Sequence, residues 1–184
     1  MGYIEELRAL VGHRPLILSG ASCVIANDRG ELLLQRRVYP EGRWCFPGGL
    51  MELGESVEDT ARREVFEETA LTVGKLRLLG VYSGPDHLCR AANGDEWYVV
   101  NAAFAALEWS GTPRVNDAES VELGWFLPDA MPGTLVRSHW EILRDYLRNT
   151  SGRIARKKQH PRFERSGGFC LCSQKFVFSA FASQ

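Results

Sequence analysis

Apolar positions follow a helical period in three stretches of the first 150 residues. The first predicts a short amphipathic helix over residues 3–11 that packs on the domain. Its apolar positions are Ile4, Leu7, Leu10 and Val11. A second helix should begin after Ser56, a good N-cap residue with Asp59 three positions later, and end near Thr69. The same period between residues 135 and 148 predicts a closing helix.

Runs of apolar residues between these helices predict strands. The turn at residues 27–30 joins the first two strands into an expected hairpin, and an Asn93-Gly94 turn lies between two later strands. Three consecutive leucines, 32–34, indicate burial on both faces, so layers should cover both sides of the sheet. The expected strands cover residues 16–26, 31–38, 73–83, 95–107 and 121–127.

Composition and charge are typical of one ordinary globular domain. The 184 residues are 45% hydrophobic and 24% charged, which allows one domain with a sizeable core. The net charge is -1, so the molecule as a whole has no attraction for nucleic acid or an acidic membrane. No apolar stretch approaches the roughly 20 residues of a spanning helix, and the first residues lack the apolar core of a signal peptide. We expect a soluble cytoplasmic protein without a membrane partner.

The five cysteines favour a reducing compartment rather than a disulfide framework or a zinc site. Their number is odd, and no pair of C-x-x-C units occurs. Cys23 and Cys45 lie among apolar residues and are expected to be small core side chains. The others are Cys89, Cys170 and Cys172.

The last segment, residues 151–184, differs in composition from everything before it. It holds seven Lys and Arg residues, one acid (Glu164) and five of the nine phenylalanines. We interpret it as an extension outside the domain. A disordered tail is the favoured interpretation, and an arm that binds nucleic acid or a partner is the alternative.

Acidic residues of the second predicted helix fall on the face that should contact the sheet. On a helical wheel they share a sector with the apolar residues Val57, Ala61 and Val65. Glu64 and Glu68 stand four positions apart and repel each other, and burial makes an unpaired charge costly. Arg63 can pair with Glu67, but by the same wheel it points to a different side from Glu64 and Glu68.

Two interpretations of this acidic face compete. An acid-rich helix face is ordinarily just solvated. The apolar stripe on the same side, and the Gly48-Gly49 turn just before the helix, favour a cation site instead. Carboxylates suit Mg²⁺, which bridges them to phosphate oxygens.

The stretch from Gly49 to Leu71 resembles the Nudix box, G-x5-E-x7-R-E-U-x-E-E-x-G-U, where U is apolar. Every position matches except the final glycine, which is Ala70. Alanine in the left-handed conformation common at a helix C-terminus would cost roughly 1 kcal/mol. The resemblance to MutT-like Nudix hydrolases implies an α/β/α sandwich with a mixed sheet over residues 16–150. Residues 1–15 would form an added N-terminal helix, and residues 151–184 would lie outside.

The resemblance also implies roles for individual residues. Mg²⁺, or Mn²⁺ in its place, would be held by Glu64, Glu67, Glu68 and the Gly48 carbonyl, with Gly49 beside it in the loop. Glu55 and Arg63 would brace the loop and the helix. A further carboxylate is expected from outside the box. Glu119 is the candidate, with Glu122 and Asp117 as rivals.

The expected reaction is attack of water on a phosphorus of a P–O–P bridge, in a nucleoside diphosphate linked to another group. Glu64 and Glu119 are both possible bases, and one of Arg36 and Arg37 should bind phosphate. Aromatic candidates for holding the base are Trp44, Tyr82, His87 and Trp97. A (deoxy)nucleoside triphosphate or a small nucleotide conjugate is the favoured substrate. The resemblance leaves open a homodimer, a nucleotide-sensing module that does not hydrolyse, and a pyrophosphohydrolase of RNA 5′ ends.

Overall fold

The computed structural model describes residues 2–150, so the predicted extension at 151–184 lies outside the described residues. Within 2–150, no helix has the length and apolar character to cross a membrane. The elements are α1 (Tyr3–Val11), β1 (Leu16–Val24), β2 (Leu32–Arg37), β3 (Trp44–Cys45), β4 (Gly48–Leu50), α2 (Val57–Thr69), β5 (Thr72–Val73), β6 (Leu76–Tyr82), the 3₁₀ turn η1 (Pro85–His87), β7 (Leu88–Arg90), β8 (Glu96–Ala106), β9 (Trp109–Ser110), β10 (Ser120–Phe126) and α3 (Arg137–Thr150).

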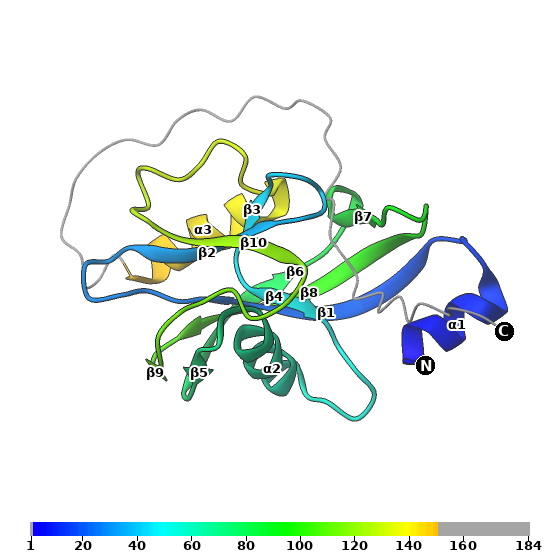
Figure 1. Ribbon diagram of the computed structural model, residues 1–184, viewed down its shortest axis with the longest axis horizontal. Coiled ribbons are helices and arrows are strands. Elements are labelled where there is room, and N and C mark those ends of the chain that lie inside the picture. The colour runs from blue at the N-terminus through cyan, green and yellow to red at the C-terminus, as the bar shows by residue number, and fades with distance from the viewer. Residues whose placement is uncertain (1, 151–184) are drawn as a thin grey trace, which may run out of the picture.

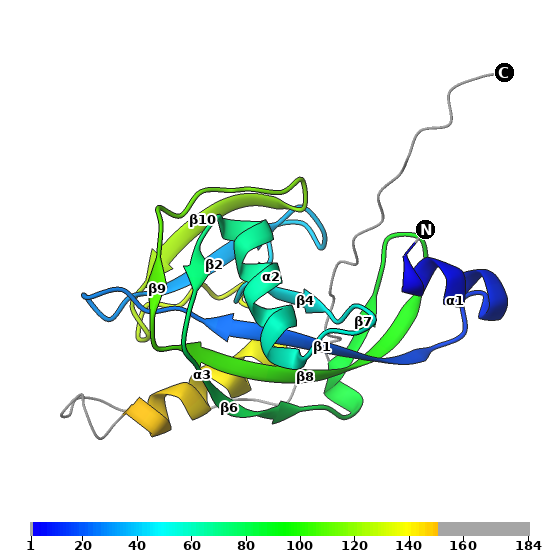
Figure 2. The same cartoon turned by 90° about the horizontal axis from the view of Figure 1, so that it is seen from below.

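The main sheet is mixed and has the order β4-β1-β8-β6, with β7 added to one end of β8. β1 runs parallel to β8 and antiparallel to β4. A second sheet has the order β10-β2-β3, and β5 pairs with β9. Helix α2 lies on one side of β1 and α3 on the other (Figures 1 and 2). This arrangement confirms the expected α/β sandwich.

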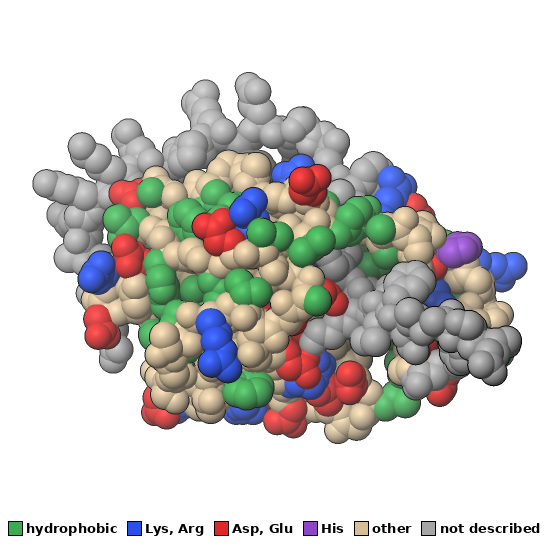
Figure 3. Space-filling view, in the orientation of Figure 1, with side chains coloured by type: hydrophobic (Ala, Val, Ile, Leu, Met, Phe, Trp, Pro, Cys, Tyr) green, Lys and Arg blue, Asp and Glu red, His purple; other side chains and the backbone are tan. Residues whose placement is uncertain are grey.

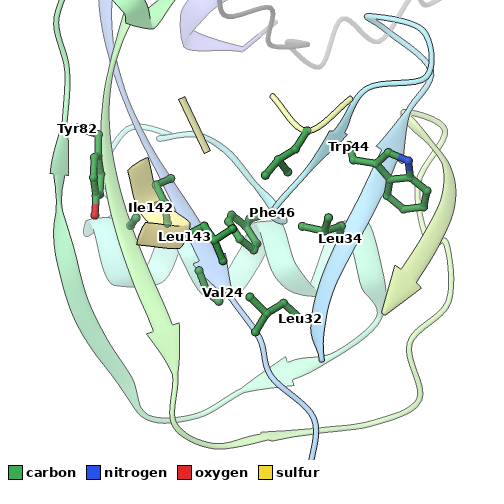
Figure 4. Close-up of a cluster of buried hydrophobic side chains, with 10 residues drawn as sticks. Val24, Leu32, Leu34, Trp44, Phe46, Tyr82, Ile142 and Leu143 are labelled. Atoms are coloured by element: carbon green, nitrogen blue, oxygen red, sulfur yellow. The ribbon is translucent and has the colours of Figure 1, made fainter. Parts of the chain in front are cut away.

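Alternation along β1 explains why both sides of the sheet are covered. Cys23 packs with Val65 of α2, whereas Val24 joins a cluster with Ile142 and Leu143 of α3. That second cluster fills the space between the two sheets (Figure 4). Successive side chains of a strand point to opposite faces, so a run of apolar residues serves two cores. Cys23, Cys45 and Cys89 are buried thiols outside any disulfide, which confirms the core positions predicted for the first two.

The predicted hairpin of residues 16–26 and 31–38 forms only next to its turn. Ala26 bridges Leu32, and the Leu33 N–H donates to the Ile25 carbonyl at 2.9 Å. Beyond this point β1 enters the main sheet, and β2 pairs with β10 and β3. The strands diverge because β2 is buried on both faces, as the three leucines predicted, and the α3 cluster lies between them. The remaining predicted strands are present with shifted ends, as is the closing helix.

Helix α1 has the predicted bounds and is fastened by a buried arginine. Arg8 donates to the carbonyls of Gly12, Arg14 and Glu96 at 3.1, 2.7 and 2.7 Å. Ile4 and Leu7 pack against a core cluster. Leu10, expected on the packed face, is instead exposed, because the helix docks through the side that carries Arg8.

Capping at both ends fixes the length of α2. The Ser56 hydroxyl accepts from the Asp59 N–H at 3.1 Å and donates to the Asp59 carboxylate at 2.6 Å, which confirms Ser56 as the N-cap. At the other end, Ala70 adopts the left-handed conformation with φ 59° and ψ 15°. Its N–H donates to the Phe66 carbonyl at 2.9 Å. The turn therefore keeps the shape that the missing glycine would favour.

A salt-bridged bracket shapes the loop between β4 and α2. Arg63 contacts both oxygens of Glu55, with one Nη2–Oε2 distance of 2.9 Å, and also donates to the Leu50 carbonyl at 3.0 Å. Glu55 in turn accepts from the Glu52 N–H and the Thr60 hydroxyl at 2.9 and 3.0 Å. The hydrogen bonds from Arg63 lower the pKa of Glu55 to about 2. The loop is thus tied to the first turns of α2.

Replacing Ala70 by glycine should stabilise the protein. Glycine removes the left-handed strain at this position, partly offset by its larger entropy in the unfolded chain, so we expect a gain of about 0.5–1 kcal/mol. The same change at Ala61, inside α2, should instead cost about 1 kcal/mol or more. Urea unfolding of both variants measures the difference. A lower stability of Ala70→Gly than of the wild type would contradict the inference that the left-handed backbone at Ala70 is strained.

The Glu55 bracket should stabilise the protein in a defined pH window. Because the folded pKa is depressed from 4.5 to about 2, the contribution is fully present above about pH 4.5 and is lost as the pH falls toward 2. Glu55→Gln should lower the free energy of unfolding near neutral pH by about 1–2 kcal/mol. Urea titrations at several pH values should show this gap narrowing below pH 4.5. Glu58→Gln, at an exposed position of the same helix, should change stability by less than about 0.5 kcal/mol. If the difference in unfolding free energy between the wild type and Glu55→Gln did not change with pH, the stabilising role of the Glu55–Arg63 pair would be contradicted.

Candidate functional site

A cleft lies where α2, β4 and the second sheet meet the start of α1. Charged side chains from several elements line it: Glu64, Glu68 and Arg63 from α2, Arg37 from the end of β2, Glu119 from the segment before β10, Glu5 from α1, and Glu52 from the loop after β4. Acidic and basic side chains lie interspersed over α2 and the loop before it (Figure 3). The structure thus brings together predicted residues that are far apart in the sequence.

Glu68 is the most deeply buried carboxylate of the cleft, with 1% of the residue exposed. Its Oε2 accepts from the Gly48 N–H at 2.7 Å, and its Oε1 lies 3.6 Å from Nη1 of Arg37. Burial raises its pKa to about 8, against the lowering effect of Arg37, and nearby Glu64 raises it further. A buried carboxylate with a carboxylate neighbour is stabilised by added positive charge.

The two glycines of β4 permit close packing, Gly49 against the Glu64 carboxylate and Gly48 against β1. A Cβ atom on Gly49 would lie 2.5–2.6 Å from the carboxylate atoms of Glu64. Gly48 has a φ of 153°, and a side chain there would collide with the Ala21 backbone. We expected a tight turn with exposed backbone here, but these residues form a strand paired with β1. The missing side chain of Gly49 leaves room for the Glu64 carboxylate.

Arg63 corrects one expectation about the helix. It was expected to point away from Glu64, yet its Nη1 donates to Glu64 at 2.7 Å and to Glu67 at 3.2 Å. The long side chain bends across the helix surface toward the loop, where Glu55 holds it. Glu67 is more exposed than the other two acids and does not line the cleft.

Of the two arginines at the end of β2, Arg37 lies in the cleft. Its Nη2 donates to Glu119 at 2.8 Å, and its side chain is buried. Arg36, on the opposite face of the strand, pairs with Glu122 at the surface. Asp117 accepts from the backbone N–H groups of Glu119 and Ser120 and shapes the turn. Glu119 is therefore the one of the three candidate acids that lines the cleft.

Three of the aromatic candidates are core residues. Trp44 packs its ring edge to face with Phe126, and Trp97 is fully buried. The Tyr82 hydroxyl donates to Asp145 at 3.0 Å. The Tyr82 ring lies at one edge of the α3 cluster (Figure 4). The structure places Trp44 and Tyr82 in the apolar cluster beside α3 and outside the cleft lining, which does not favour them as plates for a base. His87 is buried in the wall of a second pocket.

That second pocket adjoins the cleft and contains residues that sequence reasoning missed. The His139 Nδ1 accepts from the Phe46 N–H at 2.9 Å, and its ring stacks on Phe46. Burial lowers the pKa of His139 to about 3, so the imidazole is neutral. Asn101 donates to the Ser22 hydroxyl at 2.9 Å. No local pattern marks these residues, since the fold joins them from β1, β8 and α3.

The donor chemistry of the cleft fits a divalent cation. Glu64, Glu68 and Glu119 supply hard oxygen atoms of the kind that Mg²⁺ and Mn²⁺ prefer. Among residues 2–150, no three acidic, His or Cys side chains already converge as a metal cluster. The carboxylates pair with Arg63 and Arg37 instead. The raised pKa of Glu68 supports the fit, because its ionised form gains most from a cation.

Comparison with known proteins identifies the family of this chain. Residues 17–146 match the NUDIX domain family. The ADP-ribose pyrophosphatase of Methanocaldococcus jannaschii is 34% identical over 130 residues, which are 70% of this chain and 72% of that protein. The oxidized purine nucleoside triphosphate hydrolase of Mus musculus is 31% identical over 109 residues, 59% of this chain and 65% of that protein.

A solved structure supports the family at the level of the fold. The crystal structure of a MutT NUDIX hydrolase from Burkholderia pseudomallei has a TM-score of 0.60 and 31% sequence identity. The match covers 70% of this chain and 97% of that one. With the box on α2, the carboxylates in one cleft and a family match over most of its length, the chain belongs to the NUDIX domain family as a MutT-like hydrolase of phosphorus-containing acid anhydrides.

Proposed function

We propose that this protein is a Mg²⁺-dependent pyrophosphohydrolase of a nucleoside diphosphate linked to another group, with Mn²⁺ as a substitute metal. The single observation that carries the proposal is the buried carboxylate of Glu68, held in one cleft with Glu64 and Glu119. The favoured substrate is a (deoxy)nucleoside triphosphate or a small nucleotide conjugate.

Each residue of the cleft has a task in this proposal. Glu64, Glu68, Glu119 and the Gly48 carbonyl, joined by Glu67 from outside the cleft lining, would hold magnesium, which would supply positive charge to the phosphate oxygens. Arg37 lies between Glu68 and Glu119, where its planar guanidinium can donate to a phosphate oxygen. Glu64 or Glu119 accepts the proton of the attacking water. Glu55 and Arg63 keep the loop in place.

The base of the nucleotide would occupy the pocket beside the cleft. Its walls combine apolar surface from Phe46 and Val99 with the polar groups of Asn101 and neutral His139. Such a mixture orients a flat heterocycle. The relatives named above act on ADP-ribose and on an oxidized purine nucleoside triphosphate, so their names support both a conjugate and a triphosphate.

Two other functions are less well supported. A sensing module without hydrolysis would be expected to lose acids of the box, yet Glu55, Glu64, Glu67 and Glu68 are all present. Hydrolysis at RNA 5′ ends rests only on the basic composition of residues 151–184, which lie outside the described structure. A cytoplasmic location is supported by the three buried cysteines, which are thiols rather than disulfides.

A panel of nucleotides tests the function directly. The protein is incubated with triphosphates and diphosphate conjugates in Mg²⁺ or Mn²⁺, and the products are identified by mass. We expect cleavage of a P–O–P bridge that stops when EDTA is added. Binding without any cleavage would instead support the sensing module.

Glu68→Gln should abolish turnover while the fold survives. The amide keeps the shape but removes the negative charge that a cation needs, so we expect a loss on the order of a hundredfold or more in kcat. Glu58→Gln on the exposed side of the same helix is the matched control and should keep the wild-type rate. Circular dichroism and Mg²⁺ titration calorimetry check the fold and the metal. A Glu68→Gln rate near that of the wild type would refute the site.

Glu119→Gln and Glu122→Gln should separate the candidate acids outside the box. Glu119 lies in the cleft against Arg37, whereas Glu122 pairs with Arg36 at the surface. We expect Glu119→Gln to lower kcat about tenfold or more and Glu122→Gln to change it less than twofold. Thermal unfolding of each variant shows whether stability contributes. Equal losses in both variants would contradict the placement of Glu119.

A further inference from the structure

The start of α1 forms one wall of the cleft, although it lies before the family match at residues 17–146. Gly2, Tyr3, Ile4 and Glu5 line the cleft together with residues 50–53 of the loop after β4. Both views of the ribbon show α1 beside the loop between β4 and α2 (Figures 1 and 2). This wall is a feature of the chain beyond the family domain.

Buried contacts hold this wall in place. Asp95, which is 3% exposed, lies 2.8 Å from Nδ1 of His13 and 3.5 Å from Nε of Arg8. Arg8 also donates to the Glu96 carbonyl. These contacts fix α1 against the turn between β7 and β8, so Tyr3 and Ile4 have defined positions at the cleft.

The wall gives the site two compartments on either side of the phosphate-binding residues. Arg37 and residues 48–50 line both the cleft and the inner pocket that contains His139. Beyond them, the outer compartment is bounded by the start of α1 on one side and the loop after β4 on the other. A substrate whose diphosphate lies at Arg37 therefore has room for an organic group at each end.

The chemistry of the outer compartment selects what can occupy it. Tyr3, Ile4, Met51 and Leu53 offer apolar and aromatic surface, and the charged groups at its mouth are Glu5 and Glu52. The basic residues lining the described cleft, Arg37 and Arg63, already pair with carboxylates at its inner end. A terminal phosphate would face like charges there. An uncharged sugar could pack on the Tyr3 ring and donate its hydroxyls to the carboxylates.

We propose that Tyr3, with Ile4, binds an uncharged, hydroxyl-bearing group attached to the diphosphate. The protein then prefers nucleoside diphosphate conjugates of sugars over nucleoside triphosphates. This inference rests on the proposed function and adds a specificity-determining residue from outside the family domain.

Two matched substrate pairs test it: ATP against ADP-ribose, and UTP against UDP-glucose. Within each pair the nucleoside and its first two phosphates are the same, so the pair differs only in the terminal group. With the full chain and Mg²⁺, we expect kcat/KM to be at least tenfold higher for one conjugate than for its triphosphate. Tyr3→Ala should raise KM for that conjugate about fivefold to tenfold and leave kcat within twofold. KM for the triphosphate should not change.

Two further variants separate binding from stability. Tyr3→Phe keeps the ring and should retain the wild-type KM. Leu10→Ala, at an exposed position of the same helix, should leave KM unchanged for both members of each pair. Higher kcat/KM for the triphosphates, or an equal effect of Tyr3→Ala on both members of a pair, would overturn this inference and leave the proposed hydrolase intact. Absence of turnover for all four nucleotides in Mg²⁺ and Mn²⁺ would overturn both.

Discussion

Burial of carboxylates between a helix and a glycine strand is the constraint on which the rest of the structure depends. Glu64 and Glu68 face the sheet side of α2, where a helix normally places apolar side chains. Their burial is tolerated because β4 contributes glycines without side chains, a backbone N–H reaches Glu68, and an arginine pairs with each acid. The caps and the loop bracket of α2 hold the helix in the one position in which these contacts are made.

The two arginines of the cleft stabilise the buried carboxylates in different ways. Arg63 is held on several sides by Glu55, Glu64 and the Leu50 carbonyl, so it shapes the loop and has little freedom to leave. Arg37 contacts Glu119 at 2.8 Å, Glu68 at 3.6 Å and the Cys45 sulfur at 3.9 Å. A cation bound among the acids would neutralise the carboxylates that Arg37 now contacts, so its guanidinium could then donate to a phosphate. The fold thus separates a bracing arginine from one suited to substrate.

Much of the helix and its acids could be predicted from the sequence because the signals are local. Ser56, Ala70 and the spacing of the glutamates each act within one or two turns of α2. The remaining features depend on distant parts of the chain. Which of Arg36 and Arg37 faces the cleft depends on how β2 pairs with β10. His139, on α3, contacts Phe46 in the inner pocket although the two residues are 93 positions apart in the sequence. No residue near either one predicts that contact.

The position of α1 explains how selectivity can arise in a site built mainly to hold a diphosphate. In the proposed function, the box acids bind the metal and Arg37 binds phosphate. Every substrate of this reaction has these phosphates, so these residues cannot distinguish one terminal group from another. Distinction has to come from surfaces beyond the phosphates. The inner pocket provides one such surface, and its walls come from the sheets and α3. The other is provided by α1, which is attached through Arg8 and Asp95. In the proposal made above, the choice between terminal groups therefore depends on a helix outside the family match at residues 17–146.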